Sequence, residues 1–115
     1  MALTRLRIVV FPETTKSWTA RCLEHDLEAA GRTADAALDA LVRMASAHMA
    51  YDVRHGRAPL SAFGAAPRSY WNAFAGAAMS KKPLEVLRVE PHGPFTCSVT
   101  VTKENPAIRP SRIAS

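Results

Sequence analysis

The fold of this chain is decided by the stretch Leu27-Glu28-Ala29-Ala30-Gly31-Arg32-Thr33-Ala34-Asp35-Ala36-Ala37-Leu38-Asp39-Ala40-Leu41-Val42. Within it the pattern changes from a short strand to a helix. Gly31 supplies a permissive backbone at which the chain can leave the strand sharply. The hydroxyl of Thr33 can accept a hydrogen bond from a free amide of the first helical turn, and Asp35 adds negative charge where the helix dipole favours it. We therefore predict a strand over residues 27–30 and a helix that starts at Thr33.

This helix should end at about residue 55 and lie with one face on a sheet. Asp39 can pair with Arg43 one turn later on the exposed side. Gly56 is a suitable end, because glycine readily adopts the left-handed conformation found after a helix C-terminus. His48 lies on the buried stripe, where a histidine is more often partly buried than a metal ligand. The apolar members of the stripe are Leu38, Leu41, Val42, Ala45 and Met49.

Two strands precede this stretch. Residues 5–11 alternate at first, with Arg5 and Arg7 on the side opposite the apolar residues, which predicts a strand with one solvent-exposed face. Residues 12–16 have the composition of a turn, and a second alternating run follows them. We expect an antiparallel hairpin. Its core-facing residues are Leu6, Ile8, Val10, Trp18, Ala20 and Cys22.

The second half of the chain predicts a loop over residues 57–66, a short helix from Pro67, and a hairpin formed by residues 84–90 and 95–102. Leu60 and Phe63 should attach the loop to the core. The apolar stripe of the short helix consists of Tyr70, Trp71, Phe74, Ala77 and Ala78.

Together these elements predict an α+β fold. Its antiparallel β-sheet has a β-β-β-α core, followed by a short helix and a C-terminal β-hairpin, with one long helix packed on one face. We expect residues 1–102 to form one domain and residues 103–115 to form a flexible tail. The pattern leaves open whether the C-terminal hairpin joins the same sheet or a neighbouring subunit.

Residues 6 to about 52 resemble the HicB-like family. The resemblance is carried by three runs, which are Trp18-Thr19-Ala20-Arg21-Cys22-Leu23-Glu24-His25-Asp26-Leu27, Ala29-Ala30-Gly31-Arg32-Thr33 and Ala36-Ala37-Leu38-Asp39-Ala40-Leu41. It implies a partial ribonuclease H-like fold without catalytic activity, as found in the antitoxins of toxin–antitoxin systems and in solitary bacterial proteins. The chain departs from the family in having Ala36 where a glutamate often closes a capping box. Residues 80–115 also lack the DNA-binding unit of two-domain antitoxins, so operator binding does not carry over.

Composition and charge favour a cytoplasmic protein without a cofactor or metal. The 15 basic and 10 acidic side chains give a net charge of +5, and the basic residues are dispersed rather than gathered in one run. No apolar run approaches the roughly 18 residues of a membrane-spanning helix, and the N-terminus lacks an export signal. Cys22 and Cys97 lie in strand-like apolar surroundings without CxxC spacing, so we expect two small buried hydrophobic residues.

The acidic residues do not predict an enzyme. A ribonuclease H reaction needs carboxylates gathered around two magnesium ions about 4 Å apart, whereas those of this chain are dispersed. The one compact polar group is Glu24, His25 and Asp26. It could be a metal or acid–base site, or a bend whose carboxylates accept backbone hydrogen bonds. We favour the bend, because adjacent side chains on an extended backbone diverge. Serine and cysteine nucleophile motifs and phosphate-binding glycine loops are absent.

The leading hypothesis is a non-catalytic, self-associating HicB-like protein-interaction module. A thin sheet with one long helix cannot readily bury all of its aromatic side chains, which suggests a homo-oligomer. The candidate interface residues are Trp18, Tyr70, Trp71 and Phe74. A toxin-like partner is one form of this hypothesis, although a cationic chain is poorly suited to neutralise a basic toxin. The alternative is a nucleic-acid-binding module that uses the basic surface, the Thr/Ser face of the last strand and the tail.

Overall fold

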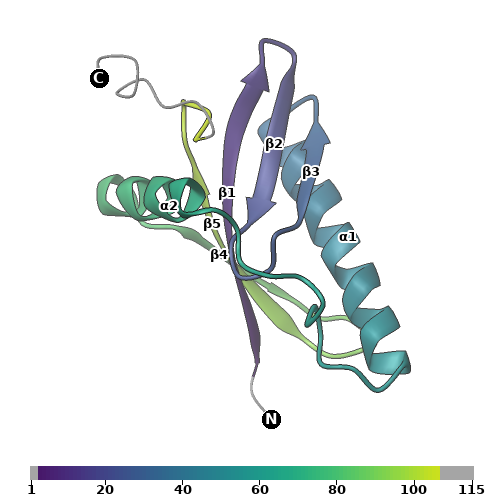
Figure 1. The fold of residues 1–115 in the computed structure, drawn as a ribbon. Coiled ribbons are helices and arrows are strands. Elements are labelled where there is room, and N and C mark those ends of the chain that lie inside the picture. The colour runs from purple at the N-terminus through teal and green to yellow at the C-terminus, as the bar shows by residue number, and fades with distance from the viewer. Residues whose placement is uncertain (1–2, 107–115) are drawn as a thin grey trace.

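The computed structural model describes residues 3–106 and has the predicted α+β fold (Figure 1). Residues 107–115, most of the predicted tail, lie outside the described residues. Within the described part the elements are β1 (Thr4–Thr14), β2 (Ser17–Cys22), β3 (Glu28–Gly31), α1 (Ala34–Arg54), α2 (Arg68–Ser80), β4 (Leu84–Arg88) and β5 (Phe95–Val101). None of the helices in this range is long and apolar enough to cross a membrane.

The strands form one sheet with the order β3-β2-β1-β5-β4. The pairs β1–β2, β2–β3 and β4–β5 are antiparallel, as the two predicted hairpins and the short third strand require. β5, however, pairs with β1 in parallel. The expectation of a wholly antiparallel sheet is therefore wrong, and the sheet is mixed. Parallel neighbours need a long crossover connection, and here the chain between β1 and β5 includes both helices.

Both ends of α1 confirm the predicted signals. The hydroxyl of Thr33 accepts a hydrogen bond from the backbone amide of Ala36 at 3.0 Å. At the other end His55 is the C-cap and Gly56 follows with φ of 69°, in the left-handed region. On the exposed side Arg43 pairs with Asp39 at 3.1 Å.

The main core lies between α1 and one face of the sheet (Figure 1). Gly31 has a second role here beyond the sharp exit from β3. A Cβ at this position would come within 2.5 Å of the Ala37 backbone nitrogen, so only glycine lets the end of β3 approach the start of α1 this closely. The largest side chains of this core are Leu6, Ile8, Leu41, Met49, Leu60 and Phe95.

A second core lies on the opposite face of the sheet, under α2. Val9 and Phe11 of β1 are fully buried there with Leu23, against Tyr70 of α2. The prediction that one face of β1 is exposed to solvent is therefore wrong for these residues. The uninterrupted apolar run from Ile8 to Phe11 was the signal of burial on both faces.

The loop after α1 is attached to the main core as predicted. Leu60 is fully buried, and Phe63 packs against the same core. Leu60 has a φ of 61°, which is unfavourable for a residue with a branched side chain. The backbone amide of Leu60 donates a hydrogen bond to the buried carboxylate of Asp52 at 2.8 Å, which helps to hold Leu60 in this conformation.

Candidate functional site

The compact polar group after β2 is used to hold structural elements together. Glu24 accepts two hydrogen bonds from Arg7 of β1, one from its backbone amide at 2.7 Å and one from its Nε at 2.6 Å. His25 turns to the loop after α1, where its Nδ1 donates to the carbonyl oxygen of Phe63 at 3.2 Å. The backbone amide of Asp26 donates to the carbonyl of Gly64 at 2.7 Å. The three side chains have different partners and do not converge on one point.

Arg21 of β2 is the centre of a larger polar network on the α2 side of the sheet. Its Nε and Nη2 donate to the two carboxylate oxygens of Asp26 at 2.7 and 3.0 Å. Its Nη1 donates to Glu28 at 3.0 Å and to the hydroxyl of Tyr70 at 3.1 Å, while the guanidinium carbon lies 4.3 Å from the Tyr70 ring centre. The hydrogen bonding of the guanidinium to the Asp26 carboxylate is the main reason that the pKa of Arg21 is raised. Arg21 is thus a fixed cation that joins the sheet to α2.

The predicted aromatic interface is largely buried within the chain. Tyr70 is buried in the second core, and Trp71 and Phe74 are partly buried against it. Trp18 is partly buried against the main core. The expectation of surplus aromatic area assumed one covered face, whereas α2 covers part of the other. Tyr70 is therefore not an exposed interface residue.

A polar group that the sequence did not reveal joins α1 to the turn between β4 and β5. The hydroxyl of Ser46 donates to the carboxylate of Glu90, and it lies 3.1 Å from Nε2 of His92. Because the single hydroxyl proton is used by Glu90, the imidazole must donate to the serine oxygen rather than accept from it. A serine nucleophile needs the opposite arrangement. Ser46 lies 44 positions before Glu90 and 46 before His92, so no local motif could have indicated their contact.

The cysteines are buried and free, as predicted. Burial raises the pKa of Cys22 to about 12 and that of Cys97 to about 11. Both are therefore neutral thiols near pH 7 and poor nucleophiles. Among the described residues, no group of three or more histidine, cysteine, aspartate or glutamate side chains is placed to hold a metal ion.

The exposed apolar side chains gather around β4. Of the eight large exposed apolar residues in the described part of the chain, five lie on β4, beside it, or at the ends of α2 and β5. We call these five the β4 surface, and they are Met79 (89% exposed), Leu84 (60%), Leu87 (61%), Val89 (77%) and Val101 (56%). Exposed apolar side chains concentrated around one strand indicate a candidate interaction site.

The position of β4 in the sheet explains this exposure. β4 ends the strand order, so only β5 pairs with it. Leu84 pairs with Val99 and faces the side of α1, whereas Leu87 pairs with Thr96 and faces the side of α2. Both leucines are more than half exposed, so neither face of β4 is well covered. An edge strand with apolar side chains on both faces is open to pairing with another chain.

Comparisons of the chain with protein-family models, with curated proteins and with solved structures found no match. The kinship with HicB-like proteins therefore stays a prediction.

Proposed function

We propose that this chain is a non-catalytic protein-interaction module that associates with itself through the β4 surface. The observation that carries the proposal is that five exposed apolar side chains lie on or near the open edge strand β4, with Leu84, Leu87 and Val89 on it or directly after it. A second chain could pair with the free edge of β4 and bury these side chains at the same time. Burial of apolar area would supply the free energy of association, and the edge hydrogen bonds would fix the direction of the partner.

The experiment is a measurement of mass in solution by size-exclusion chromatography with light scattering. The wild-type chain should be a dimer or larger at high micromolar concentration, and Leu84→Lys should weaken association at least roughly tenfold. Val53→Lys is the matched control, because Val53 is also an exposed aliphatic residue but lies on α1, outside the β4 surface. A wild-type monomer at high micromolar concentration, or equal effects of the two substitutions, would contradict the proposal.

The non-catalytic part of the proposal is supported by how the reactive groups are used. Glu24 and Asp26 are held by arginines, and the hydroxyl of Ser46 donates to Glu90. Burial keeps both cysteines as thiols. Two buried free cysteines are also in keeping with a reducing compartment, and the proposal places the chain in the cytoplasm.

The proposal includes kinship with HicB-like proteins. It is supported by the element order of β1, β2, β3 and α1 and by the Thr33 cap, which are the features that the resemblance implies. The antitoxin form of the proposal is opposed by the net charge of +5, since a basic toxin would be repelled. Co-expression with any small basic protein encoded beside this chain tests it, and rescue of growth would be the positive result.

The nucleic-acid-binding alternative gains little from the last strand. Ser98 donates its hydroxyl hydrogen bond to Glu85, and Thr100 is buried. Those side chains therefore offer few contacts to a base or phosphate. Binding of RNA or DNA in about 50 mM salt, with a steep loss of affinity as salt is raised, would favour this alternative over self-association.

A further inference from the structure

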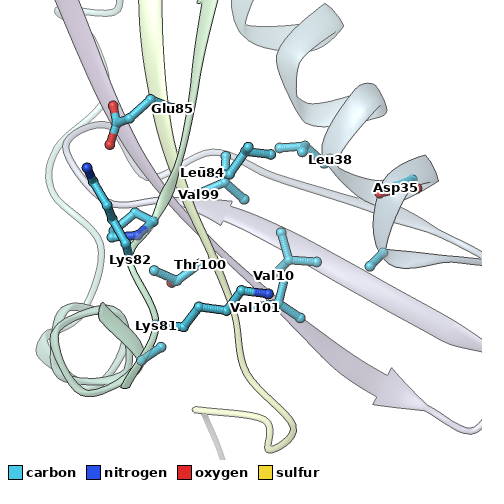
Figure 2. A pocket seen from close by; sticks show the side chains of 13 residues that line it. Val10, Asp35, Leu38, Lys81, Lys82, Leu84, Glu85, Val99, Thr100 and Val101 are labelled. Carbon is cyan, nitrogen blue, oxygen red and sulfur yellow. The ribbon is translucent and has the colours of Figure 1, made fainter. Parts of the chain in front are cut away.

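A cavity of about 670 Å³ opens beside the β4 surface, where β4 begins (Figure 2). β4 starts at Leu84, opposite Val99, so β5 continues beyond it for two residues with only β1 as a neighbour. The walls are mainly apolar, and two of their residues, Leu84 and Val101, belong to the β4 surface. The cavity continues along β5 as a smaller hollow of about 240 Å³, which shares Asp35, Leu38 and Val99 with it.

Opposite charges stand at the two sides of this cavity. Asp35, in the first turn of α1, lies on one side, and Lys81 and Lys82, just after α2, lie on the other (Figure 2). All three side chains are exposed, and none has an ion-pair partner within residues 3–106. The remaining acid of the lining, Glu85, already accepts hydrogen bonds from Ser98 with both oxygens. Figure 2 shows the Lys81 side chain extended toward Val101, across the apolar part of the lining.

A surface with a positive side, an apolar middle and a negative side is complementary to a copy of itself turned by 180°. In a two-fold interface every contact occurs twice, so a lysine of one copy facing an aspartate of the other also gives the reciprocal pair. A partner of one charge sign, such as an acidic peptide, would attract the two lysines but repel the carboxylate of Asp35. The charges therefore favour a second copy of this chain over a partner of one sign.

We propose that two copies associate across this cavity about a two-fold axis, with Lys81 of each copy paired to Asp35 of the other and with Leu84 and Val101 buried between them. This inference rests on the proposed self-association and specifies its partner and its charge pairing. The apolar middle contributes the association energy, and the crossed pairs select the orientation.

Charge reversal tests the pairing. Lys81→Glu places two like-charge contacts in the homodimer, and so does Asp35→Lys, so each variant alone should raise the dissociation constant at least roughly tenfold. An equimolar mixture of the two variants should associate about as strongly as wild type, because both crossed contacts are then attractive. The chain that carries both substitutions should also regain association. Lys16→Glu, an exposed lysine in the β1–β2 turn, is the control for the change in net charge and should leave association unchanged.

The readout is sedimentation or light scattering at matched concentrations, with thermal unfolding to verify that each variant is folded. Loss with each single reversal and recovery in the mixture supports the inference. Reversals without effect, loss without recovery, or an equal loss with Lys16→Glu overturns it. A wild-type chain that stays monomeric overturns the proposed function itself, whereas a wild-type dimer whose charge variants do not recover overturns only this pairing.

Discussion

The two sides of the sheet differ in how completely they are covered. Around β1 and β2, α1 covers one face and α2 the other, and side chains such as Val9 and Ala20 are fully buried. At β4 the leucines of both faces are more than half exposed. Under the proposed function, this difference separates the residues that stabilise the fold from those that contact a partner. The covered side should determine whether the chain folds, and the open side should determine what it contacts.

The largest expected effect comes from a comparison of two leucines, one on each side of the sheet. Leu41 of α1 is fully buried in the main core, whereas Leu84 of β4 is 60% exposed. Leu41→Ala should lower the free energy of unfolding by about 2 to 5 kcal/mol, because it removes buried methyl groups and leaves a cavity. Leu84→Ala should lower it by only about 0.5 kcal/mol or less. Urea unfolding followed by circular dichroism measures both.

These measurements belong at low protein concentration, where self-association adds little to stability. At higher concentration, Leu84→Ala should weaken association while leaving the chain folded. Leu41→Ala should lower the stability but leave the association of the folded molecules unchanged. Similar losses of unfolding free energy in the two variants would show that the open side is as important to folding as the covered side.

The elements of the covered side could be predicted because their signals are local. The Thr33 cap, the helical spacing of Leu38, Leu41 and Ala45, and the stop at Gly56 all lie within one segment. The parallel pairing of β5 with β1 could not be predicted in the same way. Alternation with period two reports which face a side chain occupies, and it does not report which strand lies beside it.

A second comparison concerns two ion pairs, one on each kind of surface. Asp26 receives two hydrogen bonds from Arg21, which is held between the sheet and Tyr70 of α2. Asp39 pairs with Arg43 on the exposed side of α1, where both side chains are more than half exposed. Asp26→Ala should lower the free energy of unfolding by about 1.5 to 3 kcal/mol, because it leaves a partly buried guanidinium with fewer acceptors. Asp39→Ala should change it by about 0.5 kcal/mol or less.

Urea unfolding at neutral pH measures both variants, and Asp39→Ala is the control for loss of one carboxylate. Equal small effects would mean that the Arg21 network is as weak as an ordinary surface pair and that α2 is held by its apolar contacts alone.

The candidate site was harder to predict than the fold, for a physical reason. The sequence indicates Glu24, His25 and Asp26 as a compact polar group, but their side chains have separate partners, Arg7, Phe63 and Arg21, which come from other elements. The same holds for the aromatic residues, since the covering of Tyr70 by the second core depends on where α2 lies. The exposure of Leu84 and Leu87 could not be predicted from the sequence, because an apolar residue in a strand pattern predicts burial.

The smallest expected effect concerns the two thiols of the covered side and depends on pH. Burial raises the pKa of Cys22 to about 12 and that of Cys97 to about 11, from an ordinary value of 9.0. Well below pH 9 both states of the chain carry mostly neutral thiols, so stability changes little with pH there. Above it the unfolded thiols ionise while the folded ones stay neutral, so the free energy of unfolding should fall as pH rises toward the folded pKa values.

The double variant Cys22→Ala, Cys97→Ala isolates this effect, because the lysines and tyrosines that titrate in the same range are common to both chains. Wild type should be the more stable chain at about pH 8, since the variant leaves small cavities in the main core. The difference between the two free energies of unfolding should shrink by about 1.5 kcal/mol between about pH 8 and pH 9.5. A difference that stays constant would mean that the unfolding of the covered side does not expose these thiols to water.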